Sequence, residues 1–178
     1  MLTGKKIVLG VSGGIAAYKM ANVASMLSKL HADIHVVMTE NATHFITPET
    51  FEVLTGNHCY TDTFDRCMEL HVPHIALGTQ ADAILIAPAS ADVVGKIANG
   101  IADDMLTTCV LPATCPVMLA PSMNVHMYEN PIVQDNMKKL ASYGYEIIEA
   151  DEGYLACRDI GKGKLPPEHV LVDYIIRA

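Results

Sequence analysis

Short apolar runs alternate with segments of helical periodicity along the whole chain, and this alternation constrains the fold more than any other feature. The runs predict five strands, at residues 6–11, 33–38, 83–87, 117–120 and 145–148. The run at 83–87 is apolar throughout, as expected of a parallel strand that is buried on both faces. Between the runs, apolar residues recur at intervals of three and four, which predicts helices at about residues 15–30, 48–54, 91–99, 100–111, 131–143 and 167–177.

Strands that alternate with helices indicate a parallel sheet with right-handed crossovers. The sequence therefore predicts an α/β fold, a doubly wound parallel sheet of the Rossmann or flavodoxin-like type with helices on both faces. A length of 178 residues fits a single domain over residues 1–178. No repeat or linker interrupts it.

Composition narrows the function classes. The net charge of −8 argues against a nucleic-acid partner. Five cysteines give an odd count without a C-x-x-C pair, which argues against a disulfide framework and indicates reduced thiols in the cytoplasm. No apolar run reaches the roughly 18 residues of a membrane span, and Met1 leads into a strand rather than a signal peptide. The eight histidines form no H-E-x-x-H motif, so no metal site is predicted.

A turn of small residues follows the first predicted strand and precedes a helix. Ser12, Gly13 and Gly14 form this turn. Glycines let the backbone approach an anion, and a helix N-terminus supplies N–H groups and a positive dipole. The turn matches neither G-x-G-x-x-G nor a phosphate-binding P-loop. A tight turn without a ligand is an equally good interpretation.

Three further segments follow predicted strands. Thr39 and Ser90 are placed to cap helices, and the small Ser90 and Ala91 permit a flat ligand to lie close. Residues 121–131 form a loop after the strand at 117–120. Because the carboxyl ends of parallel strands meet at one edge of a sheet, these segments are expected to converge with the first turn. The convergence predicts a nucleotide-like cofactor without identifying it.

The loop at 121–131 contains one amide side chain, Asn124, among apolar Met123, Val125 and Met127. An uncharged amide offers both donors and an acceptor, so Asn124 would be able to orient a carboxylate or a carbonyl in a dry pocket. The alternative is that Asn124 only satisfies backbone groups of its own loop.

Two stretches have no helical or strand period. Residues 57–69 are polar and are interpreted as a surface loop or flap. Residues 151–166 contain three glycines and are a candidate lid. His71 and His74 lie between these stretches, and each is either an acid–base group or a histidine bonded to backbone.

Several segments together, and in order along nearly the whole chain, resemble the homo-oligomeric flavin-containing cysteine decarboxylases. Residues 10–19 (GVSGGIAAYK) resemble the opening of that family, and residues 74–78 (HIALG) its active-site histidine segment. Residues 121–128 (PSMNVHMY) match its P-x-M-N-x-x-M-W motif, with Tyr128 in the last place. Residues 156–163 (ACRDIGKG) resemble its substrate-clamp motif, although Arg158 stands where Gly is usual. Leu165 also follows Lys164 where Met usually follows Arg.

The resemblance implies FMN as the cofactor, with contacts from Ser12, Gly13, Gly14, Thr39, Ser90 and Ala91. It implies conversion of 4′-phospho-N-pantothenoylcysteine to 4′-phosphopantetheine and CO₂ in coenzyme A biosynthesis. The reaction would proceed by thiol oxidation, decarboxylation and re-reduction of the enethiol.

The resemblance also assigns roles to side chains. His74 would be the acid–base or orienting group, Asn124 would hold the substrate carboxylate, and Cys157 would act as the acid in the reduction. The substrate contacts would come from Asn124, Met127, Ala156 and Cys157. The family relation further implies self-association to trimers or dodecamers with FMN at subunit contacts.

Three other classes stay open. A decarboxylase of a peptide's C-terminal cysteine shares the flavin and Asn motifs but needs no clamp cysteine, so Cys157 favours the coenzyme A pathway. A regulatory subunit that inhibits a phosphatase tends to have a long acidic tail, which this chain lacks at Ala178. A flavin prenyltransferase does not account for the Asn and Cys motifs together. We expect a stand-alone decarboxylase, because residues 1–178 leave no room for a second synthetase domain.

Overall fold

A six-stranded parallel sheet forms the centre of the molecule. The computed structural model describes residues 1–64, 72–154 and 159–178. The strand order is β3-β2-β1-β4-β5-β6, and every neighbouring pair is parallel. The strands are β1 Lys6–Val11, β2 Asp33–Met38, β3 Cys59–Tyr60, β4 Ala83–Ala89, β5 Val117–Pro121 and β6 Glu146–Ile147. Winding reverses between β1 and β4, which confirms the doubly wound fold.

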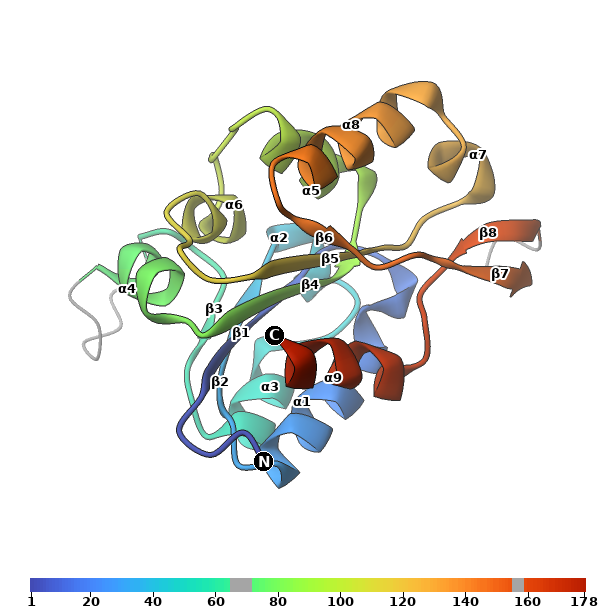
Figure 1. Cartoon of the computed structure of the whole chain (residues 1–178). Coiled ribbons are helices and arrows are strands. Elements are labelled where there is room, and N and C mark those ends of the chain that lie inside the picture. The colour runs from blue at the N-terminus through green and yellow to red at the C-terminus, as the bar shows by residue number, and fades with distance from the viewer. Residues whose placement is uncertain (65–71, 155–158) are drawn as a thin grey trace.

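Helices cover both faces of the sheet (Figure 1). One face packs against α1 Met20–Lys29, α3 Pro48–Thr55 and α9 Glu168–Arg177. The other packs against α4 Pro73–Gln80, α5 Ala91–Ala98, α6 Met105–Val110 and α8 Pro131–Ser142. Three shorter pieces follow strand ends: the 3₁₀ helix η1 Ile15–Lys19, α2 Glu40–Thr43 and α7 Val125–Tyr128. None of the helices in the described ranges is long and apolar enough to cross a membrane.

The alternation of side chains along each strand builds two separate cores. On β1, Ile7 and Leu9 join the core beneath α1, whereas Val8 joins the core beneath α5 and α6. These side chains are at most 2% exposed. Each buried aliphatic side chain contributes roughly 1.5–3 kcal/mol relative to exposure. The rigid sheet therefore fixes the carboxyl ends of its strands, where the candidate site lies.

Local signals set most helix boundaries as predicted. Thr39 and Ser90 cap α2 and α5, because their hydroxyls accept hydrogen bonds from the amides of Ala42 and Val93, each at 3.3 Å. Gly56 ends α3 in the left-handed conformation, at φ 74°.

Three predictions of irregular structure are wrong in part. The polar stretch at 57–69 contains β3, which pairs with Val36 and Val37 of β2; two residues are too few to show a strand period. The stretch at 151–166 contains an antiparallel hairpin of β7 Asp151–Tyr154 and β8 Ile160–Lys164. The hairpin projects from one end of the sheet beside α7 (Figure 1). Likewise, the loop predicted at 121–131 contains α7.

Candidate functional site

Two adjoining cavities lie at the carboxyl edge of the sheet. The larger has a volume of about 620 Å³ and the smaller about 400 Å³, within the range of small-molecule sites. They share Gly13, Ser90, Ala91 and Met127 in their walls. Segments after β1, β4 and β5 line the larger cavity, and Thr39 after β2 lines the smaller. The predicted convergence of the four segments is therefore confirmed.

The turn after β1 packs closely against α2. A Cβ added at Gly13 would lie 2.5 Å from Cβ of Asn41, so only glycine fits there. Gly14 is open, with Pro88 Cγ the nearest atom at 3.9 Å. The amides of Gly13, Gly14 and Ala91 donate to no acceptor within the described ranges. Unpaired N–H groups around a cavity suit an anionic or strongly polar ligand.

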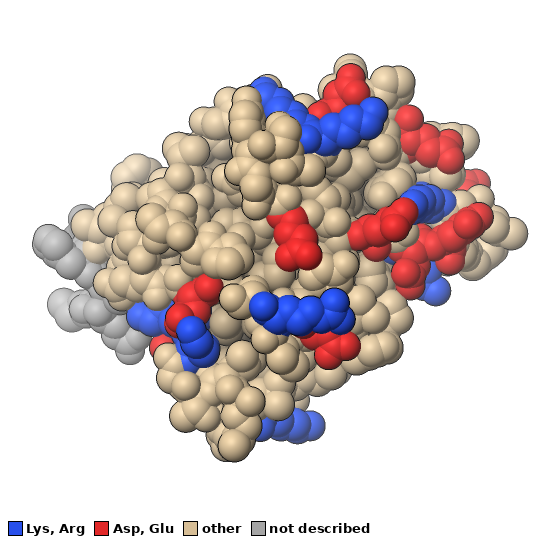
Figure 2. All heavy atoms as spheres, viewed as in Figure 1, with Lys and Arg blue, Asp and Glu red and all other residues tan. Residues whose placement is uncertain are grey.

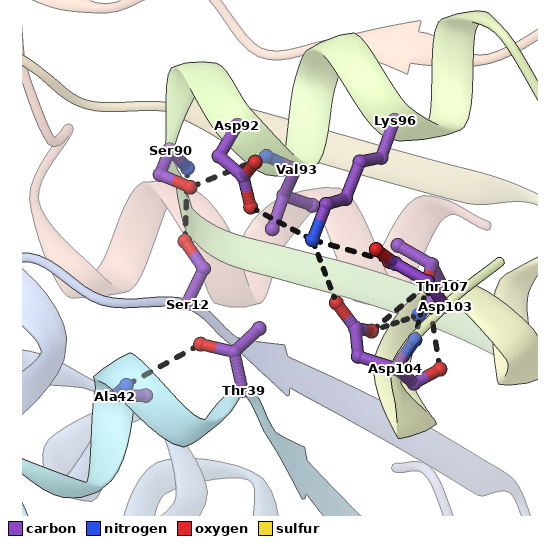
Figure 3. A network of polar contacts seen from close by, with 10 residues as sticks. All are labelled: Ser12, Thr39, Ala42, Ser90, Asp92, Val93, Lys96, Asp103, Asp104 and Thr107. Carbon is purple, nitrogen blue, oxygen red and sulfur yellow. Dashed lines mark hydrogen bonds and ion pairs between the residues drawn. The ribbon is translucent and has the colours of Figure 1, made fainter. Parts of the chain in front are cut away.

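Ser12 lies beneath the cavities rather than in their walls. It is fully buried, and its hydroxyl donates to Pro88 O at 2.6 Å and accepts from the amide of Ser90 at 2.9 Å. Figure 3 shows this side chain pointing to Ser90. The hydroxyl joins the end of β1 to the start of α5. Ser12 thus fixes the position of Ser90 and Ala91.

Asn124 caps α7 and faces the larger cavity. Its side-chain oxygen accepts from the amide of His126 at 2.9 Å, and Nδ2 donates to the carboxylate of Asp159 at 3.0 Å. The backbone interpretation of Asn124 is therefore confirmed, whereas a role toward a substrate carboxylate stays a prediction, because the carboxylate that Nδ2 contacts belongs to Asp159 of the same chain.

Charged side chains divide the two cavities sharply. Within the described residues, Lys19 and Lys164 are the charged groups that line the larger cavity, and no carboxylate does. The smaller cavity contains Lys96 together with Glu40, Asp92, Asp103 and Asp104. None of these lysines has a role that the sequence motifs predict. Lys19 lies within the GVSGGIAAYK segment, but only the fold brings it to the same cavity as Lys164.

His74 lies on α4 and does not line either cavity of its own chain. Its Nδ1 atom is buried and has no hydrogen-bond partner among the described residues. Cys157, Ala156 and the alternative histidine His71 lie outside the described residues. The structure thus brings Asn124, Met127 and the cofactor candidates together and leaves His74 apart.

The cysteines within the core have no part in the site. Burial raises the pKa of the Cys59 and Cys109 thiols to about 12, and Glu52 adds to the effect at Cys59. Such thiols are neutral and unreactive at physiological pH. In the described part of the chain, histidine, cysteine and acidic side chains form no group that could hold a metal ion.

Comparison with known proteins gives four informative matches. A family model described as Flavoprotein matches residues 1–178. The Bacillus subtilis coenzyme A biosynthesis bifunctional protein CoaBC is 49% identical over 172 residues, which cover 96% of this chain and 42% of that protein. The chain thus spans less than half of that relative.

A probable phosphopantothenoylcysteine decarboxylase of Streptococcus mutans is 42% identical over 173 residues, covering 96% of this chain and 97% of that protein. Among solved structures, the FMN-dependent cysteine decarboxylase SpaF has a TM-score of 0.85 at 34% identity, covering 99% of this chain and 98% of SpaF.

Proposed function

The chain belongs to the flavoprotein family, and from this premise we propose that it is an FMN-dependent decarboxylase of 4′-phospho-N-pantothenoylcysteine in coenzyme A biosynthesis. The products are 4′-phosphopantetheine and CO₂. The likeness to the Streptococcus mutans protein over nearly its whole length supports the substrate, and the likeness to SpaF supports the cofactor. The resemblance to the flavin-containing cysteine decarboxylases is confirmed.

The wall of the larger cavity is the observation that carries this proposal. The substrate has two anionic ends, a phosphate and a carboxylate. Lys19, Lys164 and Asn124 line one cavity whose described lining contains no carboxylate. In a chain with a net charge of −8, such a wall is a specific arrangement for anions. Asn124 already donates to one carboxylate, that of Asp159, and the same donor would hold that of the substrate.

The edge of the sheet also fits FMN. The unpaired amides of Gly13, Gly14 and Ala91 and the hydroxyl of Thr39 lie around the adjoining cavities and would bind its polar groups. Ser12 would act indirectly, through Ser90. When bound, FMN supplies a two-electron oxidation of the substrate thiol and returns the electrons after CO₂ is lost.

The residues of this chain would perform the remaining tasks. Asn124 orients the carboxylate for departure, Met127 gives the wall its apolar character, and the β7–β8 hairpin covers the cavity and excludes water. Cys157 and Ala156 belong to the segment joining β7 and β8, and Cys157 is the proposed acid for reduction of the enethiol.

Self-association would complete the site. His74 does not line the cavity of its own chain, so its proposed acid–base role needs the cavity of another copy. The region over α4 and α6 has few charged side chains (Figure 2). It exposes Val72, Ile75 and Leu111 at 40–58%. These features support self-association, for which the resemblance implies a trimer or a dodecamer built from trimers, and we propose the cytoplasm as its location.

Mass spectrometry of the product would test the function. The holoprotein is incubated without oxygen with 4′-phospho-N-pantothenoylcysteine. Loss of CO₂ alone is expected. Loss of CO₂ and two hydrogens would place the chain with the peptide-modifying decarboxylases instead. FMN binding without turnover would favour the regulatory class.

Mixing two inactive variants would test the shared site. His74→Asn and Asn124→Asp would each abolish turnover, and co-assembled oligomers would regain part of it, because some cavities would combine an intact Asn124 with an intact His74 from another copy. Absence of any recovery in mixed oligomers of confirmed composition would contradict a site built from two copies.

A further inference from the structure

Lys96 is the centre of a polar network in the smaller cavity (Figure 3). Its ammonium nitrogen lies 3.2 Å from Asp92 Oδ2, 3.1 Å from Asp103 Oδ1 and 3.5 Å from Asp104 Oδ2. Asp92 lies on the first turn of α5, whereas Asp103 and Asp104 precede α6. The Lys96 side chain therefore joins the first turn of α5 to the residues that precede α6.

Both ends of this network are fixed by other contacts. Asp104 forms a capping box with Thr107, with its carboxylate accepting from the Thr107 amide at 2.8 Å. Ser90, which caps α5, is held by Ser12 from the end of β1. Lys96 links the Asp104 cap to Asp92 in the first turn of α5, which directly follows Ser90 and Ala91 in the wall of both cavities.

The charges in this wall are strongly unbalanced without Lys96. Glu40, Asp92, Asp103 and Asp104 face the cavity, and Lys96 is the cation that accompanies them among the described residues. Burial alone would lower the pKa of Lys96, but hydrogen bonds to Asp103 and Asp92 and the nearby charge of Asp104 outweigh it and raise that pKa. The ammonium is charged at any physiological pH. It is 23% exposed, so its ion pairs are only partly screened by solvent.

We propose that Lys96 is a positioning residue for the flavin cofactor. It neutralises the carboxylates of Asp92, Asp103 and Asp104, and so holds the first turn of α5 in place and keeps the wall acceptable to the phosphate of FMN. This inference rests on the proposed cofactor. Lys96 acts through its three carboxylate partners, because its charge is already engaged by them.

Replacement by a neutral side chain of similar length tests this role. In Lys96→Met the three carboxylates would repel one another and an anionic ligand. Flavin release from the diluted holoprotein, followed by fluorescence, should show FMN affinity reduced about tenfold or more at pH 8. Riboflavin, which has no phosphate, should lose less.

Controls separate charge from structure. Lys96→Arg should retain FMN, because guanidinium keeps the charge and the hydrogen bonds. Lys138→Met should leave FMN affinity unchanged, because Lys138 lies on the exposed surface of α8, where its ion-pair partner among the described residues is Asp135. Lys96→Met combined with Asp92→Asn and Asp103→Asn should regain FMN affinity, because that wall carries one negative charge fewer than the unaltered one.

The outcomes distinguish this inference from the proposed function. Lys96→Met with unaltered FMN affinity would overturn only the role of Lys96, and so would an equal loss of affinity for FMN and riboflavin. If Lys96→Met does not fold, the triple variant decides: FMN retention supports the charge argument and its loss overturns it. Failure of the unaltered protein to bind FMN would overturn the proposed function itself.

Discussion

The two cavities at the sheet edge use lysine in opposite ways. Lys19 and Lys164 in the larger cavity come from η1 and β8 and make no ion pair with any described residue. Lys96 in the smaller cavity contacts three carboxylates. A cation without a partner is available to an anionic ligand, whereas a compensated cation shapes the wall around it. Proximity to a cavity alone does not identify a ligand-binding charge.

A negative charge placed in the larger cavity should have the largest effect on activity, because it opposes the unpaired cations there. Asn124→Asp preserves the cap of α7, because aspartate caps helices as well as asparagine does. It removes the NH₂ donor and places a carboxylate beside Asp159 and the substrate carboxylate. Decarboxylation should fall about 100-fold or more, while FMN stays bound. Product mass spectrometry and flavin absorbance would measure the two effects.

Asn130→Asp is the matched control for that substitution. Asn130 caps α8 through a hydrogen bond from the Ile132 amide at 2.9 Å, but it lies outside the cavity walls. Its replacement should leave turnover unchanged. Substantial activity in Asn124→Asp, or an equal loss in both variants, would contradict the carboxylate role of Asn124.

Loosening the β7–β8 hairpin should affect the larger cavity next most strongly. Gly163 has φ 138°, and its carbonyl accepts from the Met123 amide at 3.0 Å. A Cβ at this position would lie 2.3 Å from Met123 O. Gly163→Ala should therefore cost about 1–3 kcal/mol in the docking of the hairpin and reduce kcat/KM about tenfold or more. Hydrogen exchange of the hairpin amides would report the docking directly.

Gly153→Ala provides the comparison on the facing strand. Its Cβ would meet only the flexible Lys164 side chain, at 3.5 Å. Little change in exchange or turnover is expected. If Gly153→Ala changes hydrogen exchange and turnover as much as Gly163→Ala does, the close contact between Gly163 and Met123 does not support the cavity.

Removal of one unpaired cation should have a smaller effect. Lys19→Met should raise KM for the phosphorylated substrate about tenfold, the size of one lost charge-assisted hydrogen bond. The loss should be smaller for a substrate without the phosphate. Lys29→Met, an exposed change at the end of α1, is the control. Equal effects on both substrates would show that Lys19 does not contact the phosphate.

The body of the fold follows from the sequence because its signals are local. The buried runs at β1, β2 and β4 have the apolar character of parallel strands, and the caps at Thr39 and Ser90 depend on residues three positions apart. The two-residue strand β3 is not predictable from its own sequence, because its extended conformation depends on pairing with β2. The loop expected at 57–69 depends on the polar composition of that stretch, and composition does not reveal which backbone groups pair with another strand.

The site was only partly predictable because its charges meet through tertiary contacts. Glycines in β8 looked like flexible elements of a lid, yet Gly161 lies where a Cβ would be 2.5 Å from Val125. That close packing brings Lys164 to the same cavity as Lys19, far away along the chain. The pair of Lys96 with Asp92 is visible as an i, i+4 spacing, but its contact with Asp103 depends on how the chain turns after α5.

Ionic strength should produce the smallest effect and distinguish the two kinds of lysine without substitutions. Salt screens exposed charges over about 8–10 Å at physiological concentrations, and partly buried pairs less. Raising salt from roughly 0.05 to 0.3 M should therefore increase KM for the phosphorylated substrate about two- to threefold, with little release of FMN. The increase should be smaller in Lys19→Met, since one of the attracting charges is absent. If KM does not change with salt, or if it changes equally in the unaltered protein and in Lys19→Met, the cation of Lys19 does not attract the substrate.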